Sequence, residues 1–472
     1  MSASVHPPFQ HRSQPSPDPP TLPSAAPAVA WSTASLLPPH IGKYRVKAKL
    51  GEGATSEVFL AHDPFRGQDV AIKRVRRNVN ADAREAHFQQ RFFEAEAALV
   101  GRLKHPNVVQ ILDAVDDSLA PYLVMEYVSG GTLRRYCRAD ALLPLATVVE
   151  VGFKCAMALG YVFKQGLIHR DVKPANLLVR MDGDQIAEVK VTDFGSVFNM
   201  GADHTQIFRV GSLAYMSPEQ LDGDTLDSRA DIYSLSAVLF HLLAGRPPFD
   251  AVQQQGIMNQ IYNATPPSLA LLREGVSPQL QQLIERGLAK KREDRQADWD
   301  EFAQALSTLV SDRHVPRGPL LGVLDSERFT QLRALDFFEG FGDVELWEVV
   351  RRAMWQRHSF GQTLFRKGDV GNMFYIVTQG QVEVYRDGNK AASLGAGASV
   401  GEMAYLAPNP ELRVHAVDIL VSQAATTIAF TPDTLKQLSL ATRSLFDGAF
   451  IRVLVRRLHS AHEALAHPRR IL

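Results

Sequence analysis

The chain has 472 residues, which is too long for one ordinary hydrophobic core and indicates two or three domains. Its 51 lysines and arginines balance its 51 aspartates and glutamates, so net charge gives no support to a nucleic-acid partner or an anionic membrane surface. Cys137 and Cys155 are the only cysteines, which excludes a disulfide framework and favours a reducing compartment. The apolar runs are too short to cross a bilayer and the N-terminus shows no secretion signal. We therefore expect a cytoplasmic protein without membrane insertion.

The first forty residues contain ten prolines, many serines and few charges. Such a segment cannot bury enough apolar surface to offset its chain entropy. The composition therefore predicts a disordered Pro-rich tail over residues 1–40.

The next stretch predicts a strand, a glycine turn and a second strand over residues 50–59, with Gly51 and Gly53 in the turn. Glycines allow a backbone to approach phosphate groups closely. An alternating strand at 70–73 then carries Lys73, whose ammonium could reach the same phosphates. Residues 83–103 have helical spacing of apolar residues, and Glu96 in this helix could pair with Lys73.

A short polar loop at residues 169–178 supplies a carboxylate, an ammonium and a carboxamide from Asp171, Lys173 and Asn176. The carboxylate can accept the proton of an attacking hydroxyl, the ammonium can offset phosphate charge, and the amide oxygen can bind a metal. A predicted strand at 189–192 leads directly into Asp193. This combination of groups suits phosphoryl transfer.

With these motifs in this order, residues 44–305 resemble a Hanks-type serine/threonine protein kinase of the kind common in bacteria. The resemblance implies an α+β, bilobal fold, with a β-rich N-lobe and a helical C-lobe, that phosphorylates Ser or Thr of protein substrates with ATP and Mg²⁺. The position of Lys173, two residues after Asp171, is the serine/threonine pattern. Ser56 stands where the family usually has a third glycine.

The resemblance also implies a role for each motif residue. ATP contacts fall on Leu50, Gly51, Gly53, Val58, Lys73, Glu96, and the backbone of Glu126 and Val128 after the gatekeeper Met125. Asp171 is implied as the catalytic base and Lys173 as the γ-phosphate contact, while Asn176 and Asp193 are implied as the Mg²⁺ ligands. Asp231 would brace the catalytic loop, and Arg295 would pair with Glu219.

Residues 196–217 would be the activation loop, with Thr205 as the best-placed phosphate acceptor and Ser196 and Ser212 as rivals. Arg170 directly precedes the catalytic aspartate, and an arginine there can pair with a phosphorylated loop.

Composition changes after a linker, and residues 325–465 predict a second module. Helices are expected at 329–335 and 344–352, short strands at 359–365, 373–378 and 381–385, a hairpin turn at Asp387-Gly388, and a closing helix at 441–466 whose basic side is solvated. The frequent glycines indicate an all-β roll between the helices.

Residues 400–406 combine small residues with Glu402, and Arg413 follows eleven residues after that glutamate. A turn of backbone N–H groups plus one arginine can bind an anion such as a cyclic phosphate. This part resembles a cyclic-nucleotide-binding domain, which implies that Glu402 contacts the ribose of cAMP or cGMP and that Arg413 contacts the phosphate. The loop before Arg413 is longer than usual, and Val414-His415 replace the usual small residues after it.

The sequence thus predicts a kinase domain at 44–305, a linker at 306–324 and a jelly-roll (β-roll) cyclic-nucleotide-binding module with flanking helices at 325–465. Its favoured function is a kinase regulated by a cyclic nucleotide. Two alternatives stay open. The C-terminal roll could serve only for docking or for pairing two copies as a homodimer, or the whole chain could be a non-catalytic scaffold. Intact Lys73, Asp171, Asn176 and Asp193 argue against the scaffold.

Overall fold

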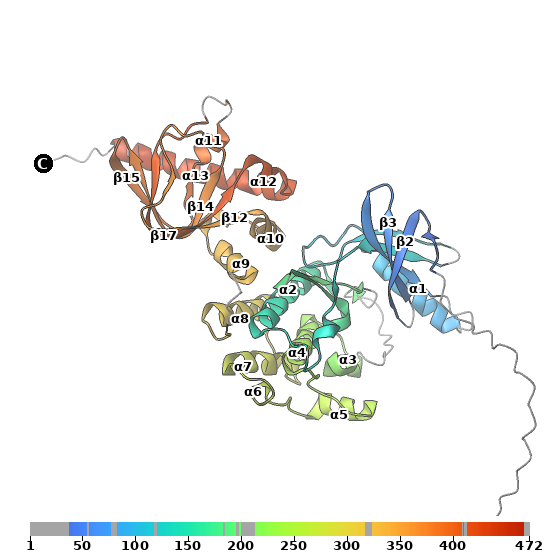
Figure 1. Cartoon of the computed structure of the whole chain (residues 1–472). Coiled ribbons are helices and arrows are strands. Elements are labelled where there is room, and N and C mark those ends of the chain that lie inside the picture. The colour runs from blue at the N-terminus through green and yellow to red at the C-terminus, as the bar shows by residue number, and fades with distance from the viewer. Residues whose placement is uncertain are drawn as a thin grey trace, which may run out of the picture.

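A computed structural model describes residues 37–53, 56–76, 83–117, 120–182, 185–194, 198–199, 213–316, 323–407, 409 and 413–466. Most of the Pro-rich segment, and Thr205, Ser196 and Ser212 of the expected activation loop, lie outside the described residues. The chain forms a β-rich lobe, a helical lobe and a C-terminal β-roll, which Figure 1 shows from blue through green to red.

The N-terminal lobe is an antiparallel six-stranded sheet in the order β1-β2-β3-β4-β6-β5, with one helix packed against it. Its elements are β1 (His40–Ile41), β2 (Tyr44–Glu52), β3 (Ser56–Asp63), β4 (Gln68–Val75), α1 (Ala83–Ala97), β5 (Ile111–Val115) and β6 (Tyr122–Glu126). Strand β4 alternates as a two-faced strand should: Val70 and Ile72 pack into one core, and Ala71 and Lys73 point to the other side. That second side faces the helical lobe.

The helix expected to run to residue 103 ends at Ala97, because the chain turns there through backbone bonds such as Leu99 N to Glu96 O (3.0 Å). Strand β5 begins at Ile111, and just before it Val108 forms a single parallel bridge with Val191. That bridge ties the N-terminal lobe to the strand that leads into Asp193.

The helical lobe is built around α2 (Leu145–Lys164) and α4 (Ser228–Ala244), both almost wholly buried. Around them lie α3 (Pro218–Asp222), α5 (Gln254–Asn263), α6 (Leu269–Leu272), α7 (Pro278–Gly287) and α8 (Trp299–Ser311). Among the described residues, α2 alone is long and apolar enough to cross a membrane, but 94% of its apolar window is buried inside the protein. Helix α2 is therefore a core helix.

Short strands line the edge of the helical lobe that faces the β-rich lobe. A three-stranded sheet joins β10, β9 and β7, and a two-stranded one joins β11 and β8. The strands are β7 (Gly131–Thr132), β8 (Leu167–Ile168), β9 (Leu177–Asp182), β10 (Gln185–Val191) and β11 (Phe198–Asn199). The polar loop at 169–176 is held between β8 and β9.

The C-terminal module is a β-roll with helices before and after it. The helices are α9 (Asp325–Arg333), α10 (Asp343–Arg352), α11 (Glu402–Leu406), α12 (Pro432–Lys436) and α13 (Leu440–Ala466). The strands are β12 (Met354–His358), β13 (Thr363–Phe365), β14 (Phe374–Arg386), β15 (Asn389–Leu394), β16 (Ser399–Val400) and β17 (Asp418–Phe430). The long strands β14 and β17 pair along most of their length.

The two strands expected at 373–378 and 381–385 are one strand, β14. Its register with β17 shifts between Val377 and Val382, and Gly380 lies there with φ of 81°. A β-bulge with a left-handed glycine bends a strand without ending it, which explains the interruption in the alternating pattern. The hairpin expected at Asp387-Gly388 is confirmed, because both residues have positive φ between paired Arg386 and Asn389.

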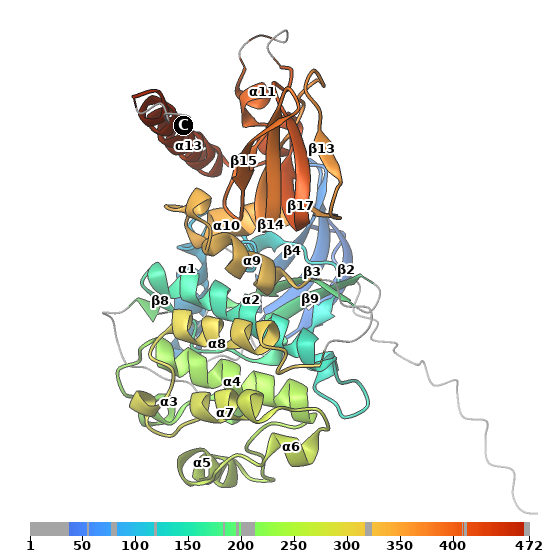
Figure 2. The same cartoon turned by 90° about the vertical axis from the view of Figure 1, so that its left-hand side faces the viewer.

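The junction between the helical lobe and the module is a continuous core. Phe153 of α2 packs against Phe329 of α9 and Trp347 of α10, with ring centroids 6.0 and 6.1 Å away. A buried polar group borders these rings: Lys154 donates to Asp325 (2.9 Å), and the Ser326 hydroxyl donates to Glu150 (2.5 Å). Figure 2 shows α9 and α10 lying between α2 and the roll. The module is therefore anchored to the same helix that forms the core of the helical lobe.

Candidate active site

The ammonium of Lys73 lies at the centre of the site. It donates to both carboxylate oxygens of Glu96 (2.9 and 2.7 Å) and to Asp193 Oδ1 (2.7 Å). Strand β4 positions Lys73, helix α1 positions Glu96, and Asp193 follows the end of β10. The sequence prediction that Lys73 and Glu96 pair is confirmed, and three elements of two lobes meet at one cation.

Electrostatics at this cluster favour the charged forms of Lys73 and Asp193. Burial alone would lower the pKa of Lys73, but the Asp193 and Glu96 carboxylates outweigh it and raise that pKa. Burial alone would likewise raise the pKa of Asp193, and the adjacent Lys73 ammonium instead holds it well below its usual range. The site therefore keeps a fixed cation beside a fixed anion at neutral pH.

The polar loop brings Asp171, Lys173 and Asn176 together as predicted. Lys173 Nζ donates to Asp171 Oδ2 (2.7 Å), and Asn176 Nδ2 donates to the same oxygen (3.0 Å) and to the Asp171 carbonyl (2.8 Å). These bonds fix the rotamer of the Asp171 carboxylate, which is 11% exposed. A carboxylate held in this way can accept a proton from a hydroxyl group that enters the site.

Asp231 of α4 holds the polar loop in place, as predicted. It lies in the first turn of α4 and accepts hydrogen bonds from the backbone N–H groups of His169 (2.8 Å) and Arg170 (2.9 Å). Burial raises the pKa of Asp231 despite these donors and the nearby cations. The brace holds Arg170 at φ of 66°, a left-handed conformation that a non-glycine residue adopts only under constraint.

Backbone bonds bring the two candidate metal ligands side by side. Thr192 N donates to the Asn176 carbonyl (3.0 Å), so Asp193 follows directly beside the polar loop. Phe194, 2% exposed, packs edge-on against His169 at 5.1 Å, which turns Asp193 toward Lys73. No cluster of three or more His, Cys, Asp or Glu occurs in the described part of the chain. Two oxygen ligands suit Mg²⁺, which usually takes its remaining ligands from phosphates and water.

The glycine turn is open above this cluster. A Cβ at Gly51 would meet no atom within 4 Å, and Gly53 N donates to the Ser56 carbonyl (2.8 Å) to close the turn. Leu50 is 46% exposed and Val58, paired with Lys73, is half-buried, so both leave apolar surface at the mouth of the site. Ala71 lies on the same face of β4 as Lys73 and therefore faces the site. It was not among the predicted site residues, although the alternation along 70–73 indicates its position.

The end of β6 forms the far edge of the site. Glu126 N donates to Gln110 O (2.9 Å), and Val128 is buried at the start of the connector to the helical lobe. Gly130 packs so closely that a Cβ would lie 2.0 Å from the Val179 carbonyl, so only glycine fits there. The Glu126 side chain pairs with Lys190 of β10 (2.7 Å), which the sequence did not indicate.

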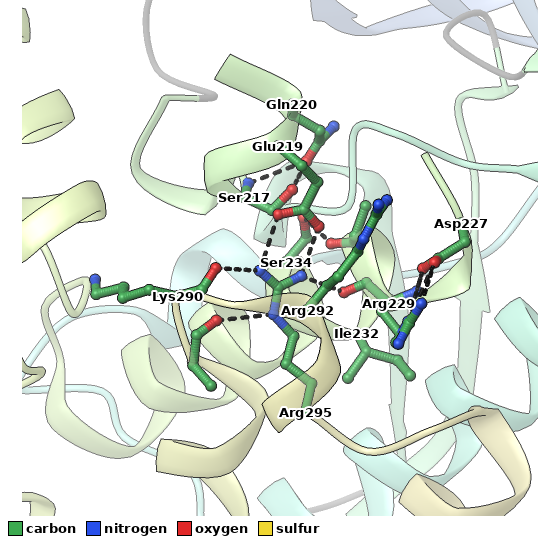
Figure 3. Close-up of polar contacts among 12 residues, drawn as sticks. Ser217, Glu219, Gln220, Asp227, Arg229, Ile232, Ser234, Lys290, Arg292 and Arg295 are labelled. Atoms are coloured by element: carbon green, nitrogen blue, oxygen red, sulfur yellow. Dashed lines mark hydrogen bonds and ion pairs between the residues drawn. The ribbon is translucent and has the colours of Figure 1, made fainter. Parts of the chain in front are cut away.

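A buried ion pair between Glu219 and Arg295 links α3 to the rest of the helical lobe, as Figure 3 shows. Arg295 donates to the two carboxylate oxygens of Glu219 (2.6 and 2.9 Å) and to the carbonyls of Ala289, Arg229 and Lys290. The Arg295 side chain is fully buried and lies over the Tyr233 ring. The predicted Glu219–Arg295 pair is confirmed, and it fixes α3 directly after the expected activation loop.

In the second candidate site, in the module, both predicted ligand residues have protein partners. Glu402 opens α11, is 1% exposed and forms an ion pair with Arg457 of α13. Arg457 also donates to the Ser399 carbonyl (2.6 Å). Arg413 is exposed, and its described contact is a long bond to the Ala407 carbonyl (3.5 Å). The two predicted ligand residues therefore have different partners.

On the basic side of the closing helix, which was expected to be solvated, two arginines also have protein partners. Arg457 pairs with Glu402, and Arg452 donates to the carbonyls of Glu339 (2.9 Å) and Phe337 (3.4 Å). Arg469 and Arg470 lie outside the described residues. His415 is buried and stacks on Phe365 with centroids 3.7 Å apart, so it packs within the roll.

Comparison with known proteins supports the assignment of both the kinase region and the C-terminal module. Residues 44–308 match the protein kinase domain, and residues 355–439 match the cyclic nucleotide-binding domain. The serine/threonine-protein kinase PknB of Mycobacterium leprae is 36% identical over 267 residues, 55% of this chain and 42% of that protein. PknB of Mycolicibacterium smegmatis and of Mycobacterium tuberculosis H37Rv are each 34% identical, covering 63% and 62% of this chain and 47% of each relative.

The chain thus spans less than half the length of these relatives. The kinase match covers more than half of the chain and includes every residue of the Lys73 cluster and of the polar loop. The chain therefore belongs to the protein kinase family and carries a C-terminal cyclic nucleotide-binding domain.

Proposed function

We propose that this protein transfers the γ-phosphoryl group of ATP to Ser or Thr residues of protein substrates. One observation carries the proposal: the Lys73 ammonium bridges Glu96 and Asp193 while Asp171 is held beside them by Lys173 and Asn176. Phosphoryl transfer depends mainly on positioning and charge stabilisation, and these residues provide both.

Each residue has a task in this reaction. Lys73, held by Glu96, binds the α- and β-phosphates beneath the open glycine turn. Asp193 and Asn176 hold Mg²⁺, which neutralises phosphate charge when it is bound. Asp171 orients the substrate hydroxyl and accepts its proton, and Lys173 offsets charge at the γ-phosphate. The formed Lys73–Glu96 pair and the inward Phe194 support catalysis over the scaffold alternative.

The test is phosphate transfer from labelled ATP to a generic basic protein by the full chain, followed by phosphoamino-acid analysis. Asp171→Asn should lower kcat by about 10²- to 10⁴-fold, the usual contribution of a general base. Asp182→Asn, at the exposed end of β9, is the matched control and should leave the rate unchanged. Equal rates for wild type and Asp171→Asn, or phosphotyrosine alone, would contradict the proposal.

We also propose that the C-terminal module binds a cyclic nucleotide, cAMP or cGMP, and thereby regulates the kinase. The domain match supports this, as does the turn at Gly401, whose left-handed conformation directs the backbone into α11. In the resting arrangement Glu402 is paired with Arg457, so a ribose hydroxyl would compete with that arginine.

Calorimetric titration of the full chain with cAMP and cGMP tests this second proposal. Arg413→Ala should weaken binding of the phosphate about tenfold or more, because a charged hydrogen-bond partner is lost. Arg457→Gln should instead strengthen binding by freeing Glu402. No heat of binding with either nucleotide would favour the alternative in which the roll docks a protein or pairs two copies, and sedimentation would then separate those outcomes.

A cytoplasmic location is likewise a proposal. Cys137 and Cys155 are buried and unpaired, in keeping with a reducing compartment. Cell fractionation would test it, and recovery in a secreted fraction would overturn it.

A further inference from the structure

Four charged side chains connect the C-terminal module to the edge of the candidate ATP site. We call them the charge chain: Arg351 of α10, Glu188 and Lys190 of β10, and Glu126 at the end of β6. Arg351 Nη2 lies 3.4 Å from Glu188 Oε1, Glu188 lies 3.6 Å from Lys190 Nζ, and Lys190 Nζ lies 2.7 Å from Glu126 Oε1. Glu188 and Lys190 are two residues apart on a strand and therefore share a face.

The members of the charge chain become more buried toward its centre. The Arg351 side chain is 36% exposed, Glu188 17%, Lys190 6% and Glu126 30%. A buried ammonium is stable only while it is paired, so Lys190 depends on the two carboxylates beside it. Glu126 depends in turn on Lys190, the cation that lies 2.7 Å from it.

Glu188 contacts three cations, so the loss of one of them changes how strongly it attracts the other two. Besides Lys190 and Arg351 it accepts from Arg180 Nε of β9 (3.4 Å). Burial alone would raise the pKa of Glu188, but Lys190 and Arg351 lower it overall, so the carboxylate is charged at neutral pH. His105 interacts with Lys190 and Arg351, and burial together with these two cations lowers its pKa to about 3. It is therefore neutral there.

The charge chain ends at the backbone of the candidate adenine contact. Glu126 begins the connector whose backbone is the candidate adenine contact, and Gln110 N also donates to its carboxylate (3.3 Å). If Arg351 is removed, Glu188 loses one cation and attracts Lys190 more strongly, away from Glu126. The connector then loses one of the two contacts that hold the Glu126 side chain.

We propose that Lys190 is a positioning residue for adenine binding and that Arg351, from the C-terminal module, sets its position through Glu188. This inference rests on the proposed kinase function, because it concerns the same nucleotide site. It assigns the module a direct connection to ATP affinity through side chains outside the phosphate-binding machinery.

The test compares ATP KM, kcat and calorimetric ADP affinity for the full-length protein and three variants. Arg351→Gln should raise ATP KM and the ADP dissociation constant about threefold, within the range for a partly exposed ion pair, and leave kcat within twofold. Lys190→Met should raise both constants more, by about tenfold, since it removes the ammonium that contacts Glu126 and leaves that partly buried carboxylate with the Gln110 N–H among its described contacts. Arg352→Gln is the matched control: it removes the same charge from the next position of α10, where the side chain contacts Gln437, and should change neither constant.

The double variant separates coupling from general damage. In the Lys190→Met background, Arg351→Gln should have no further effect on ADP affinity, because its only route runs through Lys190. Multiplying effects in the double variant, or an Arg351→Gln protein equal to wild type, would overturn the inference. If wild type binds ADP but transfers no phosphate, the kinase proposal fails and the binding comparison still decides this one. A wild type that binds no ADP overturns both.

Discussion

His105 shows how one buried side chain can carry a pH dependence. It is 3% exposed, stacks on Tyr161 at 5.3 Å and accepts from Asn107 N through Nδ1 (3.1 Å). Burial lowers its pKa to about 3, from an ordinary value of 6.5. Below pH 6.5 the unfolded chain therefore binds a proton at His105 that the folded chain does not bind. The free energy of unfolding is at its full value above pH 6.5 and decreases as the pH falls from 6.5 toward 3.

We expect His105→Phe, which keeps the ring, to reduce this pH dependence. Between pH 7 and pH 5 the free energy of unfolding of the wild type should fall by about 2 kcal/mol more than that of the variant. The reason is that only the wild type binds a proton at residue 105 when it unfolds. Urea unfolding of both proteins at the two pH values measures the difference. A packing difference between the two rings changes stability equally at both pH values, so identical pH slopes for the two proteins would contradict the assignment.

At the scale of elements, the Glu219–Arg295 pair joins α3 to the turn before α8. Arg295 is fully buried and bonded to three backbone carbonyls as well as to the carboxylate, so its removal leaves a buried charge without a partner. Arg286 and Glu301 make a comparable pair on the surface, at 45% and 40% exposure. The two pairs differ in burial, and Arg286 also donates to the Arg295 carbonyl (3.2 Å), so the Arg286 variant tests an exposed pair beside the buried one.

Arg295→Met should destabilise the protein by about 3–5 kcal/mol, the usual result of breaking a buried pair. Arg286→Met should cost about 1 kcal/mol or less, because solvent screens the exposed pair. Thermal or urea unfolding measures both. Adding Glu219→Gln to Arg295→Met should restore part of the loss, and a double variant as unstable as the sum of both single changes would show that the unpaired charge is not the cause.

At the scale of the whole molecule, the module and the helical lobe share one core. Phe329 and Trp347 pack on Phe153 of α2, and the Lys154–Asp325 and Ser326–Glu150 contacts are buried beside them. A polar group buried at a domain junction is stable only when every member has its partner. We infer that the kinase region and the module unfold together.

Calorimetric unfolding of the wild type should therefore show one transition. Phe329→Ala should split it into two or broaden it, since it removes a large aromatic side chain from the shared core at a cost of about 3–5 kcal/mol. Phe360→Ala, at a ring that is 78% exposed in the module, is the control and should leave a single transition. Two transitions in the wild type would contradict the shared core.

The kinase motifs were predictable from the sequence because each depends on neighbours in the chain. Asp171, Lys173 and Asn176 lie within one loop, and β4 carries Lys73 on the face that its alternation predicts. The hairpin at Asp387-Gly388 is equally local. Even the Lys73–Glu96 pair follows from a fixed order of motifs, and residue-by-residue resemblance was enough to place it.

Three features were decided by the tertiary structure alone. Glu402 and Arg457 are 55 positions apart, Lys190 and Glu126 are 64 apart, and Arg351 and Glu188 are 163 apart. A pattern along the chain records which side chains are charged or apolar, but a charge selects its partner by distance in three dimensions. The sequence therefore identified the kinase and the β-roll, and only the packing of α10 and α13 determined which charges each unit presents to its candidate site.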